Sequence, residues 1–300
     1  MSRGLSWFPG HMAAAMREMA SSRVKQAHIV VEVRDARVPF SSACNAAAMS
    51  VVPARKRSLI LMNKTDLSGL SPQTQDGIAR RIREEQPDAN VLFISAKSQH
   101  RTERDVLSVI RQQAAGLSRF SSTTRVVLIV GVPNVGKSTI LNCIRRSSAC
   151  KVAAQPGCTR IISEHKLPGL LLLDSPGILP PNIPDEVTAA RLALTHAIPD
   201  HSVDKHDLVT YLLQCLKTLP AALGGLSSNV SNTETLLEEV ARRRRFHLGN
   251  DGEWDVDRAA SFLVAEYRAG NLGRLCLDPL DEFGVLPVER CRHPPRSSHC

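Results

Sequence analysis

Two sequence motifs occur in an unusual order in this chain of 300 residues. The sequence NKTD at residues 63–66 matches a base-recognition motif, and GVPNVGKS at residues 131–138 matches the phosphate-loop pattern G-x-x-x-x-G-K-[ST]. In most proteins that contain both motifs, the phosphate loop comes first and the base-recognition motif follows it. The reversed order predicts a circular permutation, in which the same strands and helices are connected in a rotated sequence order.

Hydrophobic runs that end in polar motifs recur from residue 27 to about residue 177. These strand-sized runs cover residues 27–33, 59–62, 91–94, 126–130 and 170–173. Between them, residues 72–85 and 103–115 have the spacing of amphipathic helices. This alternation predicts an α/β fold with a mostly parallel sheet and flanking helices. The polar residues after each strand would then lie at the carboxyl edge of the sheet, where open α/β sheets bind ligands.

The pattern changes after Pro180 and Pro181. Residues 186–197, 205–219, 232–245 and 257–269 are predicted to be helices without strands between them. We therefore expect a circularly permuted phosphate-loop domain over residues 1–180 and a small all-helical domain over residues 181–280. Residues 281–300 are rich in Pro, Arg and Ser, which predicts a disordered tail.

The net charge of +9 favours a polyanionic partner, either nucleic acid or an anionic membrane surface, although a generally basic proteome would give the same value. No apolar run approaches the roughly 20 residues that a membrane-spanning helix requires. The first 24 residues contain Arg3, Arg17 and Arg23 with only one acid, Glu18, a composition that resembles a mitochondrial targeting segment.

The eight cysteines show no paired spacing, and several lie within predicted core elements. We therefore expect free thiols in a reducing compartment rather than a disulfide framework. In the tail, Cys291, His293, His299 and Cys300 match no common zinc-site spacing, so we expect no metal site there.

The phosphate loop follows a predicted strand and precedes a predicted helix that begins near Lys137. Its backbone N–H groups would surround the phosphates of a nucleotide, the Lys137 ammonium would reach the β- and γ-phosphates, and the Ser138 hydroxyl would bind Mg²⁺. The residues of this loop expected to contact the nucleotide are Pro133, Asn134, Val135, Gly136, Lys137, Ser138 and Thr139.

The residues after two neighbouring strands would select the base. The Asp66 carboxylate accepts hydrogen bonds from guanine N1–H and from the N2 amine, neither of which adenine supplies. After the next strand, Ser95, Ala96 and Lys97 would place a backbone N–H near guanine O6. Together with Asn63 and Lys64, these residues predict a site for GTP or GDP rather than for ATP.

Two further segments would sense the γ-phosphate. After the strand at 170–173, Asp174 is expected to hold Mg²⁺ through a water molecule, and the Gly177 N–H to contact the γ-phosphate. Thr159, in the segment 156–160, is the expected second hydroxyl on Mg²⁺.

Ile178 occupies the position at which Ras-like enzymes have a glutamine that orients the attacking water. Because isoleucine cannot form that hydrogen bond, we expect slow unaided hydrolysis that depends on a polar group from elsewhere. Asn134 matches the enzymes that use K⁺ near the phosphates, although Asn is also a common loop residue in its own right.

Together with five further motifs, these residues resemble the circularly permuted GTPases that assemble large ribosomal subunits, over about residues 5–280. The motifs are WFPGHM at 7–12, DARVP at 35–39, GVPN at 131–134, DRAA at 257–260 and GNLGR at 270–274. The chain departs from the family in a short segment at 142–155, in little room for a presequence before residue 7, and in a tail without a counterpart.

The resemblance implies that His11 contributes to hydrolysis, by orienting water, and that the domain at 181–280 binds ribosomal RNA. The four arginines at 242–245 are its candidates for phosphate contact, although such a run is often a solvated helix face. The expected partners are GTP or GDP and the large ribosomal subunit. The expected location is the mitochondrial matrix, with peripheral attachment to the inner membrane as an option and the cytoplasm as the alternative.

These expectations describe a slow GTPase that uses Mg²⁺ and K⁺, docks on a maturing large subunit and leaves after hydrolysis. The chain runs from the γ-phosphate sensor directly into the helical domain, so the nucleotide state could set the orientation of that domain. One alternative is an RNA-binding scaffold that GTP gates with negligible hydrolysis. Another is a membrane-associated signalling GTPase, which the lack of a lipidation motif disfavours.

Overall fold

The computed structural model describes residues 5–6, 22–44, 57–117, 124–146, 162–179, 182–216, 232–248 and 253–280. Several predictions fall outside these ranges. They concern His11 and its motif, Thr159 and its segment, Pro180 with Pro181, and the tail from residue 281.

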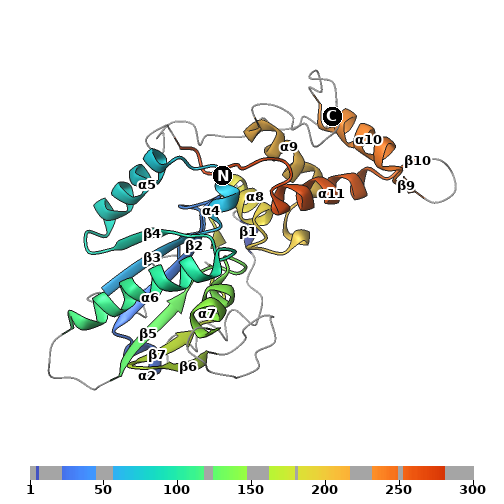
Figure 1. The fold of residues 1–300 in the computed structure, drawn as a ribbon. Coiled ribbons are helices and arrows are strands. Elements are labelled where there is room, and N and C mark those ends of the chain that lie inside the picture. The colour runs from blue at the N-terminus through green and yellow to red at the C-terminus, as the bar shows by residue number, and fades with distance from the viewer. Residues whose placement is uncertain are drawn as a thin grey trace.

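A six-stranded sheet forms the centre of the molecule, in the spatial order β4-β3-β2-β5-β7-β6 (Figure 1). The strands are β2 (Ile29–Asp35), β3 (Arg57–Asn63), β4 (Asn90–Phe93), β5 (Arg125–Val130), β6 (Ser163–Leu167) and β7 (Leu170–Asp174). All neighbours are parallel except β6 and β7. The α/β prediction with a mostly parallel sheet is therefore confirmed.

The edge strand β6 is the one strand of this sheet that the hydrophobic runs did not indicate. Four of the five residues in its sequence, SEHKL, are polar, and these four alternate between partly buried and exposed positions. An antiparallel edge strand can leave one face in water, so it needs no continuous apolar run.

The strand connectivity agrees with the predicted permutation. Strand β5, which leads into the phosphate loop, lies in the middle of the sheet between β2 and β7, although β2 comes first in the chain. The chain builds β2, β3 and β4 outward on one side before it returns to the centre at β5. Parallel pairing places Asp35 at the end of β2 directly beside Asn63 at the end of β3.

Helices cover both faces of the sheet. Helix α5 (Pro72–Glu85) begins at Ser71, whose side chain accepts a hydrogen bond from the Thr74 N–H, and buries Ile78 and Ile82 with Ile60 and Met62 of β3. Helices α6 (Gln99–Ala115) and α7 (Lys137–Arg146) pack on the other face. Two short helices complete this region, α2 (Ser22–Lys25) and α4 (Thr65–Ser68).

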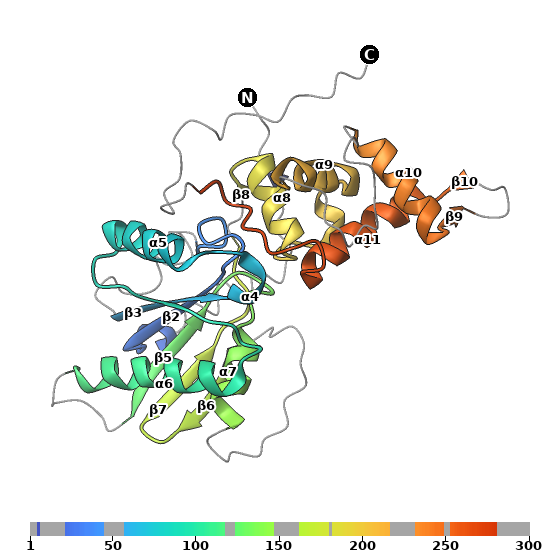
Figure 2. The same ribbon diagram turned by 45° about the horizontal axis from the view of Figure 1, so that its top comes forward.

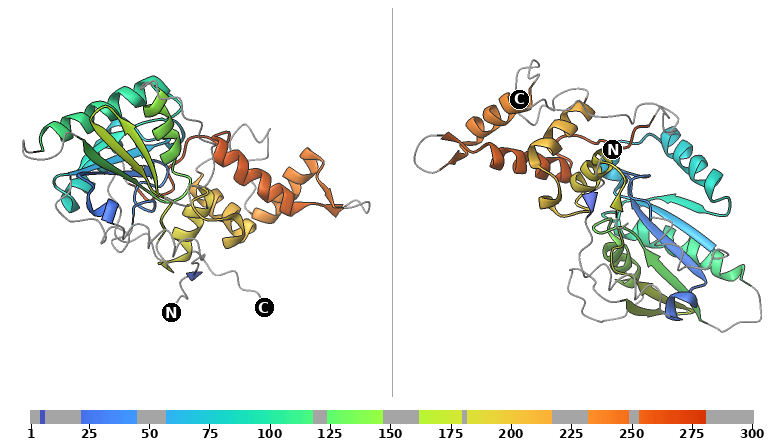
Figure 3. Two further views of the ribbon diagram at one scale, coloured as in Figure 1. Left: turned by 90° about the horizontal axis from the view of Figure 1, so that it is seen from below. Right: turned by 180° about the vertical axis from the view of Figure 1, so that it is seen from behind.

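The C-terminal helices project to one side of the sheet, as the two views in Figure 3 show. They are α8 (Glu186–Leu194), the 3-10 helix η1 (Asp200–Ser202), α9 (Lys205–Cys215), α10 (Thr233–Arg244) and α11 (Val256–Ala269). The four predicted helices are thus present, with boundaries that differ by a few residues.

Short strands occur where only helices were expected. Between α10 and α11, β9 (His247–Leu248) pairs with β10 (Glu253–Trp254), and β8 (Asn182–Ile183) pairs with β1 (Leu5–Ser6) near the N-terminus. The region is therefore not purely helical. Two-residue strands are too short to produce a hydrophobic periodicity, which is why the sequence did not indicate them.

The segment that follows α11 returns to the sheet and ties the helical region to it (Figure 2). The Leu275 N–H donates to the Leu67 carbonyl at 3.1 Å, and the Leu277 N–H donates to the Arg37 carbonyl at 2.7 Å. The Asp278 carboxylate accepts hydrogen bonds from the backbone N–H groups of Phe40 and Ser41. These contacts place the helical region beside the loops that follow β2 and β3.

Buried apolar side chains from the sheet face that α6 and α7 cover and from the helical region form one connected cluster, which includes Leu172, Leu192 and Leu263. Within the part of the chain that the structure describes, no helix is long and apolar enough to cross a membrane.

Candidate nucleotide-binding site

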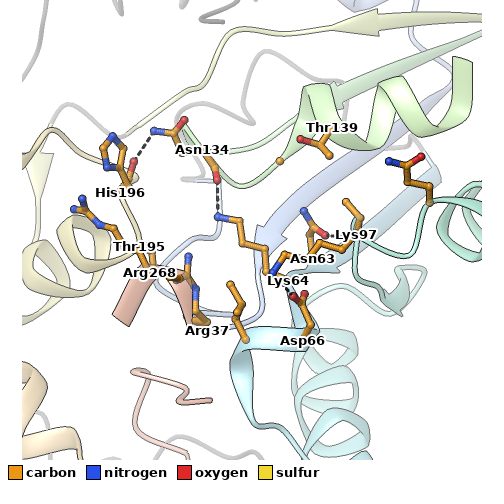
Figure 4. Close-up of a pocket in the computed structure, with 15 residues that line it drawn as sticks. Arg37, Asn63, Lys64, Asp66, Lys97, Asn134, Thr139, Thr195, His196 and Arg268 are labelled. Atoms are coloured by element: carbon orange, nitrogen blue, oxygen red, sulfur yellow. Dashed lines mark hydrogen bonds and ion pairs between the residues drawn. The ribbon is translucent and has the colours of Figure 1, made fainter. Parts of the chain in front are cut away.

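A cavity of about 710 Å³ lies at the carboxyl ends of the strands, between the sheet and the helical region (Figure 4). Its lining is Arg37, Asn63, Lys64, Asp66, Leu67, Ala96, Lys97, Gln99, Asn134, Gly136, Thr139, Thr195, His196, Arg268 and Ala269. Residues of the phosphate loop and of both base-recognition segments therefore line one cavity. The contributions of α8 and α11 were not predicted.

The phosphate loop connects β5 to α7 and contains two residues in the left-handed region. Asn134 has φ 58° and Gly136 has φ 101°. A Cβ atom at Gly136 would lie 2.3 Å from Asn63 Nδ2, so glycine is required there for space as well as for conformation. This close approach allows Asn63 Nδ2 to donate to the Val135 carbonyl at 2.8 Å.

Lys137 lies at the base of this loop. Its ammonium donates to the carbonyl oxygens of Gly131 at 2.9 Å and Val132 at 3.0 Å. Burial lowers the pKa of Lys137 to about 8, against the opposing influence of the Asp174 carboxylate. The side chain is thus held inside the loop where the nucleotide phosphates would bind, as expected for a phosphate-loop lysine.

Ser138 and Asp174 have the composition and proximity of a magnesium site. The Ser138 hydroxyl donates to Asp174 Oδ2 at 3.4 Å, and Asp174 is only 2% exposed. Hydroxyl and carboxylate oxygens are ligands that Mg²⁺ prefers, so these residues fit the predicted metal. The third predicted ligand, Thr159, lies outside the described residues. Among the described residues, no group of three or more His, Cys, Asp or Glu side chains forms a separate metal cluster.

Asp66 is oriented by two residues of the other base-recognition segment. Ser95 Oγ donates to Asp66 Oδ1 at 2.7 Å, and Lys97 Nζ lies 3.1 Å from Asp66 Oδ2. Partial burial acts to raise the pKa of Asp66, but these hydrogen bonds outweigh it and hold the pKa below its usual value. The carboxylate therefore stays ionised at neutral pH, ready to accept two hydrogen bonds from guanine.

Asn63 connects the phosphate loop to the base-recognition segments. Its Oδ1 accepts a hydrogen bond from the Ala96 N–H at 3.0 Å, while its Nδ2 bonds to Val135. The Ala96 N–H, one of the expected donors to guanine O6, is thus engaged by Asn63 in this structure. The side chain of Asn63 holds the two loops at a fixed separation.

Lys64 crosses the cavity and is held by Asp35, an acid for which no single sequence motif predicted this contact. Its Nζ donates to the Asn134 carbonyl at 2.7 Å and lies 2.9 Å from Asp35 Oδ2. The buried Asp35 also accepts from Arg37, with Arg37 Nη2 at 2.8 Å, and Arg37 lies over the ring of Tyr267 in α11. Burial acts to raise the pKa of Asp35, but the charges of Lys64 and Arg37 outweigh it and lower the pKa.

Substitution of Asp35 by Asn should destabilise the protein and weaken GDP binding. The change leaves Lys64 and Arg37 without their buried counter-ion, which costs roughly 3 kcal/mol of folding stability. It also frees Lys64 to move, and we expect GDP affinity to fall roughly tenfold, the equivalent of about 1.4 kcal/mol. Denaturant unfolding and titration with fluorescent GDP would measure both effects.

Asp76→Asn is the matched control for this prediction, because Asp76 is exposed on α5, away from the cavity. Equal stability and GDP affinity in Asp35→Asn and Asp76→Asn would contradict the role of Asp35 in positioning Lys64.

Asn134 joins the phosphate loop directly to the helical region. Its Nδ2 donates to the His196 carbonyl at 2.7 Å, just beyond the end of α8. Figure 4 shows the amide oxygen of Asn134 turned away from His196. A potassium ion would bind this oxygen, so the side chain fits the predicted role of Asn134 as a K⁺ ligand. Its nitrogen meanwhile contacts the helical region.

Ile178 does not face the reaction site. Its side chain is 2% exposed and packs with Val24, Val30 and Leu173 in the core beneath the sheet. Its backbone N–H donates to the Gly131 carbonyl at 3.2 Å. The structure therefore agrees with the expectation that this residue cannot orient water.

The chain is similar to several known GTPases. Residues 126–246 match the family model of the 50S ribosome-binding GTPase. Mouse mitochondrial ribosome-associated GTPase 1 is 33% identical, with 91% of this chain and 89% of the mouse protein covered. Ribosome biogenesis GTPase A of Thermotoga maritima is 31% identical over 96% of this chain and 99% of its own length. The crystal structure of GNP-bound YlqF from T. maritima superposes with a TM-score of 0.60 at 26% identity, covering 85% of this chain and 94% of that one.

Proposed function

Because the chain belongs to the family of circularly permuted GTPases that includes mitochondrial ribosome-associated GTPase 1 and ribosome biogenesis GTPase A, we propose that it assembles the large ribosomal subunit. The chain is a GTPase. Beyond this activity, we propose that it binds the maturing large ribosomal subunit and that hydrolysis controls its release. The observation that carries it is the shared cavity, where the phosphate loop contacts the helical region through Asn134 and His196.

The chemistry is attack of water on the γ-phosphate of GTP. Lys137 would bind the β- and γ-phosphates, and Asp66 would hold the guanine base so that the γ-phosphate meets the sensor loop at Gly177. Ser138, Thr159 and Asp174 would hold Mg²⁺, which supplies charge neutralisation on the phosphates. These residues position the substrate and stabilise the developing charge rather than form a covalent bond.

The water-orienting group is missing from the sensor loop, since Ile178 is buried in the core. On the basis of its motif, we assign the orientation of water to His11. Docking of the protein on the subunit would also order the switch segments. Asn134 would contribute an oxygen ligand to K⁺, adding positive charge near the phosphates. Unaided hydrolysis should accordingly be slow.

Two connections could carry the nucleotide state to the helical region. One is the Asn134–His196 hydrogen bond, and the other is the segment 275–278, which bonds to the backbone at Leu67 next to Asp66. A ligand that moves the phosphate loop would change the first contact and thereby bias the position of α8. Hydrolysis would then release the protein from the subunit.

The helical region is the proposed contact with ribosomal RNA, and the arginines at 242–245 are its candidates for phosphate contact. The proposed location is mitochondrial, which the names of the mitochondrial relatives support. Within the mitochondrion we propose the matrix, with peripheral attachment to the inner membrane as an option. The cytoplasm is the alternative. A GTP-gated RNA-binding scaffold with negligible hydrolysis is the second candidate function, favoured by the buried Ile178.

Purified large ribosomal subunits should stimulate GTP hydrolysis strongly, and more in K⁺ than in Na⁺. His11→Ala should reduce the stimulated rate by about 100-fold, a typical contribution of a positioned proton-transfer or water-orienting group. Release of phosphate under single-turnover conditions measures the rate. GDP affinity should remain the same, because the task assigned to His11 concerns the attacking water and not the nucleotide.

His100→Ala, an exposed position on α6, is the control for the histidine substitution. Subunit binding without any stimulation of hydrolysis, in either salt, would instead support the scaffold function.

A further inference from the structure

Two arginines and two phenylalanines form a ladder of cation–π and ring contacts at the outer end of the helical region. The Arg258 guanidinium lies over the Phe246 ring at 4.5 Å, and the Arg244 guanidinium lies over the Phe262 ring at 4.4 Å. The two rings contact each other edge to face, with their centroids 5.9 Å apart. In Figure 1 this end, where α10, β9, β10 and α11 meet, is the part of the helical region farthest from the sheet.

The ladder follows from how α10 ends and α11 begins. Arg245 adopts a left-handed conformation with φ 56°, and the Phe246 N–H donates back to the Ala241 carbonyl at 2.9 Å. This helix ending folds Phe246 against α10, directly after Arg244. In α11, Arg258 and Phe262 are four residues apart and therefore lie on one helix face.

A second aromatic pair extends the same end. The His247 ring of β9 stacks on the Trp254 ring of β10, with centroids 4.6 Å apart and planes tilted by 33°. Leu248 is 53% exposed, and it is the one large hydrophobic side chain among the described residues that stands out in this way. The end of the region thus presents flat rings, guanidinium planes and an apolar side chain together.

The arginine run at 242–245 divides into two pairs of different character. Arg242 and Arg243 both contact the Glu239 carboxylate, with Arg243 Nε 2.7 Å from Oε1. By contrast, Arg244, Arg245 and Arg258 form no ion pair with an acid in the described part of the chain. Among these five arginines, the charge that has no acidic partner among the described residues therefore lies on Arg244 and Arg258 of the ladder and on the adjacent Arg245.

We propose that this ladder binds unpaired RNA bases. A guanidinium that lies over a ring has one side covered, so an unpaired base can stack on its outer side while its N–H groups reach phosphate oxygens. Arg244 and Arg258 are both exposed, which leaves these outer faces accessible. The inference rests on the proposed function and deepens it, because it specifies loops or bulges of ribosomal RNA rather than the phosphates of any duplex.

The test uses the full chain and a fluorescent RNA hairpin with an unpaired loop, compared with a blunt duplex that has the same stem. Fluorescence anisotropy should show tighter binding to the hairpin. The double variant Arg244→Lys with Arg258→Lys keeps both charges but removes both guanidinium planes. It should lower the affinity for the hairpin by about tenfold, within the range measured for loss of base stacking, and change duplex binding little.

Arg242→Lys with Arg243→Lys is the matched control, since these arginines are occupied by Glu239. It should leave hairpin binding unchanged, and thermal unfolding should confirm that both double variants are folded. Equal affinity of the wild type for hairpin and duplex would overturn the inference, as would full hairpin binding by Arg244→Lys with Arg258→Lys. Tighter binding of the wild type to cardiolipin-containing vesicles than to the RNA hairpin would also overturn it, in favour of a membrane partner.

Subunit-stimulated hydrolysis separates this inference from the proposed function. Absence of stimulation in the wild type counts against the assembly function itself. Stimulation in the wild type together with hairpin binding unaffected by the ladder substitutions counts only against the ladder.

Discussion

Asp66→Asn should weaken the binding of GTP and GDP by about 1,000-fold or more and should create binding of xanthine nucleotides. The carboxylate accepts hydrogen bonds from guanine N1–H and N2, whereas an amide presents its own N–H group to the N2 amine. Xanthine has an oxygen in place of that amine, which can accept the hydrogen bond from the Asn side chain. Ser95 still donates to the substituted side chain, so its orientation should persist.

Competition of xanthosine diphosphate and GDP for the site would measure this exchange. Asp88→Asn, on the exposed surface after α5, is the control and should bind GDP like the wild type. Unchanged GDP binding by Asp66→Asn would contradict direct contact between Asp66 and the base. So would a loss of GDP binding without any gain for xanthosine diphosphate in a variant that unfolds at the same temperature as the wild type.

Gly136→Ala should reduce GDP affinity by roughly 100-fold, the equivalent of about 3 kcal/mol of strain and displacement. The added Cβ would lie 2.3 Å from Asn63 Nδ2, at a backbone position with φ 101°. Either the phosphate loop must open or Asn63 must leave its hydrogen bonds with Val135 and Ala96. In both cases the phosphate and base segments lose their fixed separation.

Gly169→Ala separates this effect from simple backbone strain. Gly169 also has a left-handed conformation, with φ 75°, but a Cβ atom there would meet nothing within 4 Å. This control should cost about 1 kcal/mol of folding stability and leave GDP affinity unchanged. Isothermal titration of both variants with GDP provides the comparison, and equal affinities would refute the contact between Gly136 and Asn63.

Most of the sheet could be predicted because its buried strands are continuous apolar runs bounded by polar motifs. Helix α5 was predicted over the same residues, 72–85, that the structure shows. Strand β6 was not predicted because an edge strand with one face in water needs no apolar run. The β9–β10 pair was not predicted because its strands are too short to show a hydrophobic periodicity. Where hydrophobic burial did not dictate the residue types, the sequence carried no signal.

The candidate site likewise contains residues that sequence motifs indicate and contacts that only the folded structure shows. The positions of Lys137, Asp66 and Asp174 in or near the loops after strands could be predicted because each belongs to a short motif that ends a strand or follows one. Asp35 was noticed only within a family motif, and its contact with Lys64 depends on β2 lying beside β3. The hydrogen bond between Asn134 and His196 joins residues 62 positions apart, and no local pattern encodes it.

The sequence alone determined the class of fold, the permuted order of its motifs and the chemistry expected at the phosphate loop and base segments. These properties reside in local patterns of burial and in short runs of residues that act together. Only the tertiary structure decided that the helical region contacts the phosphate loop, that Asp35 holds Lys64, and that Arg244 stacks on a ring while Arg242 pairs with Glu239. Such contacts depend on how distant segments pack, because a side chain acquires its partner only when the chain has folded.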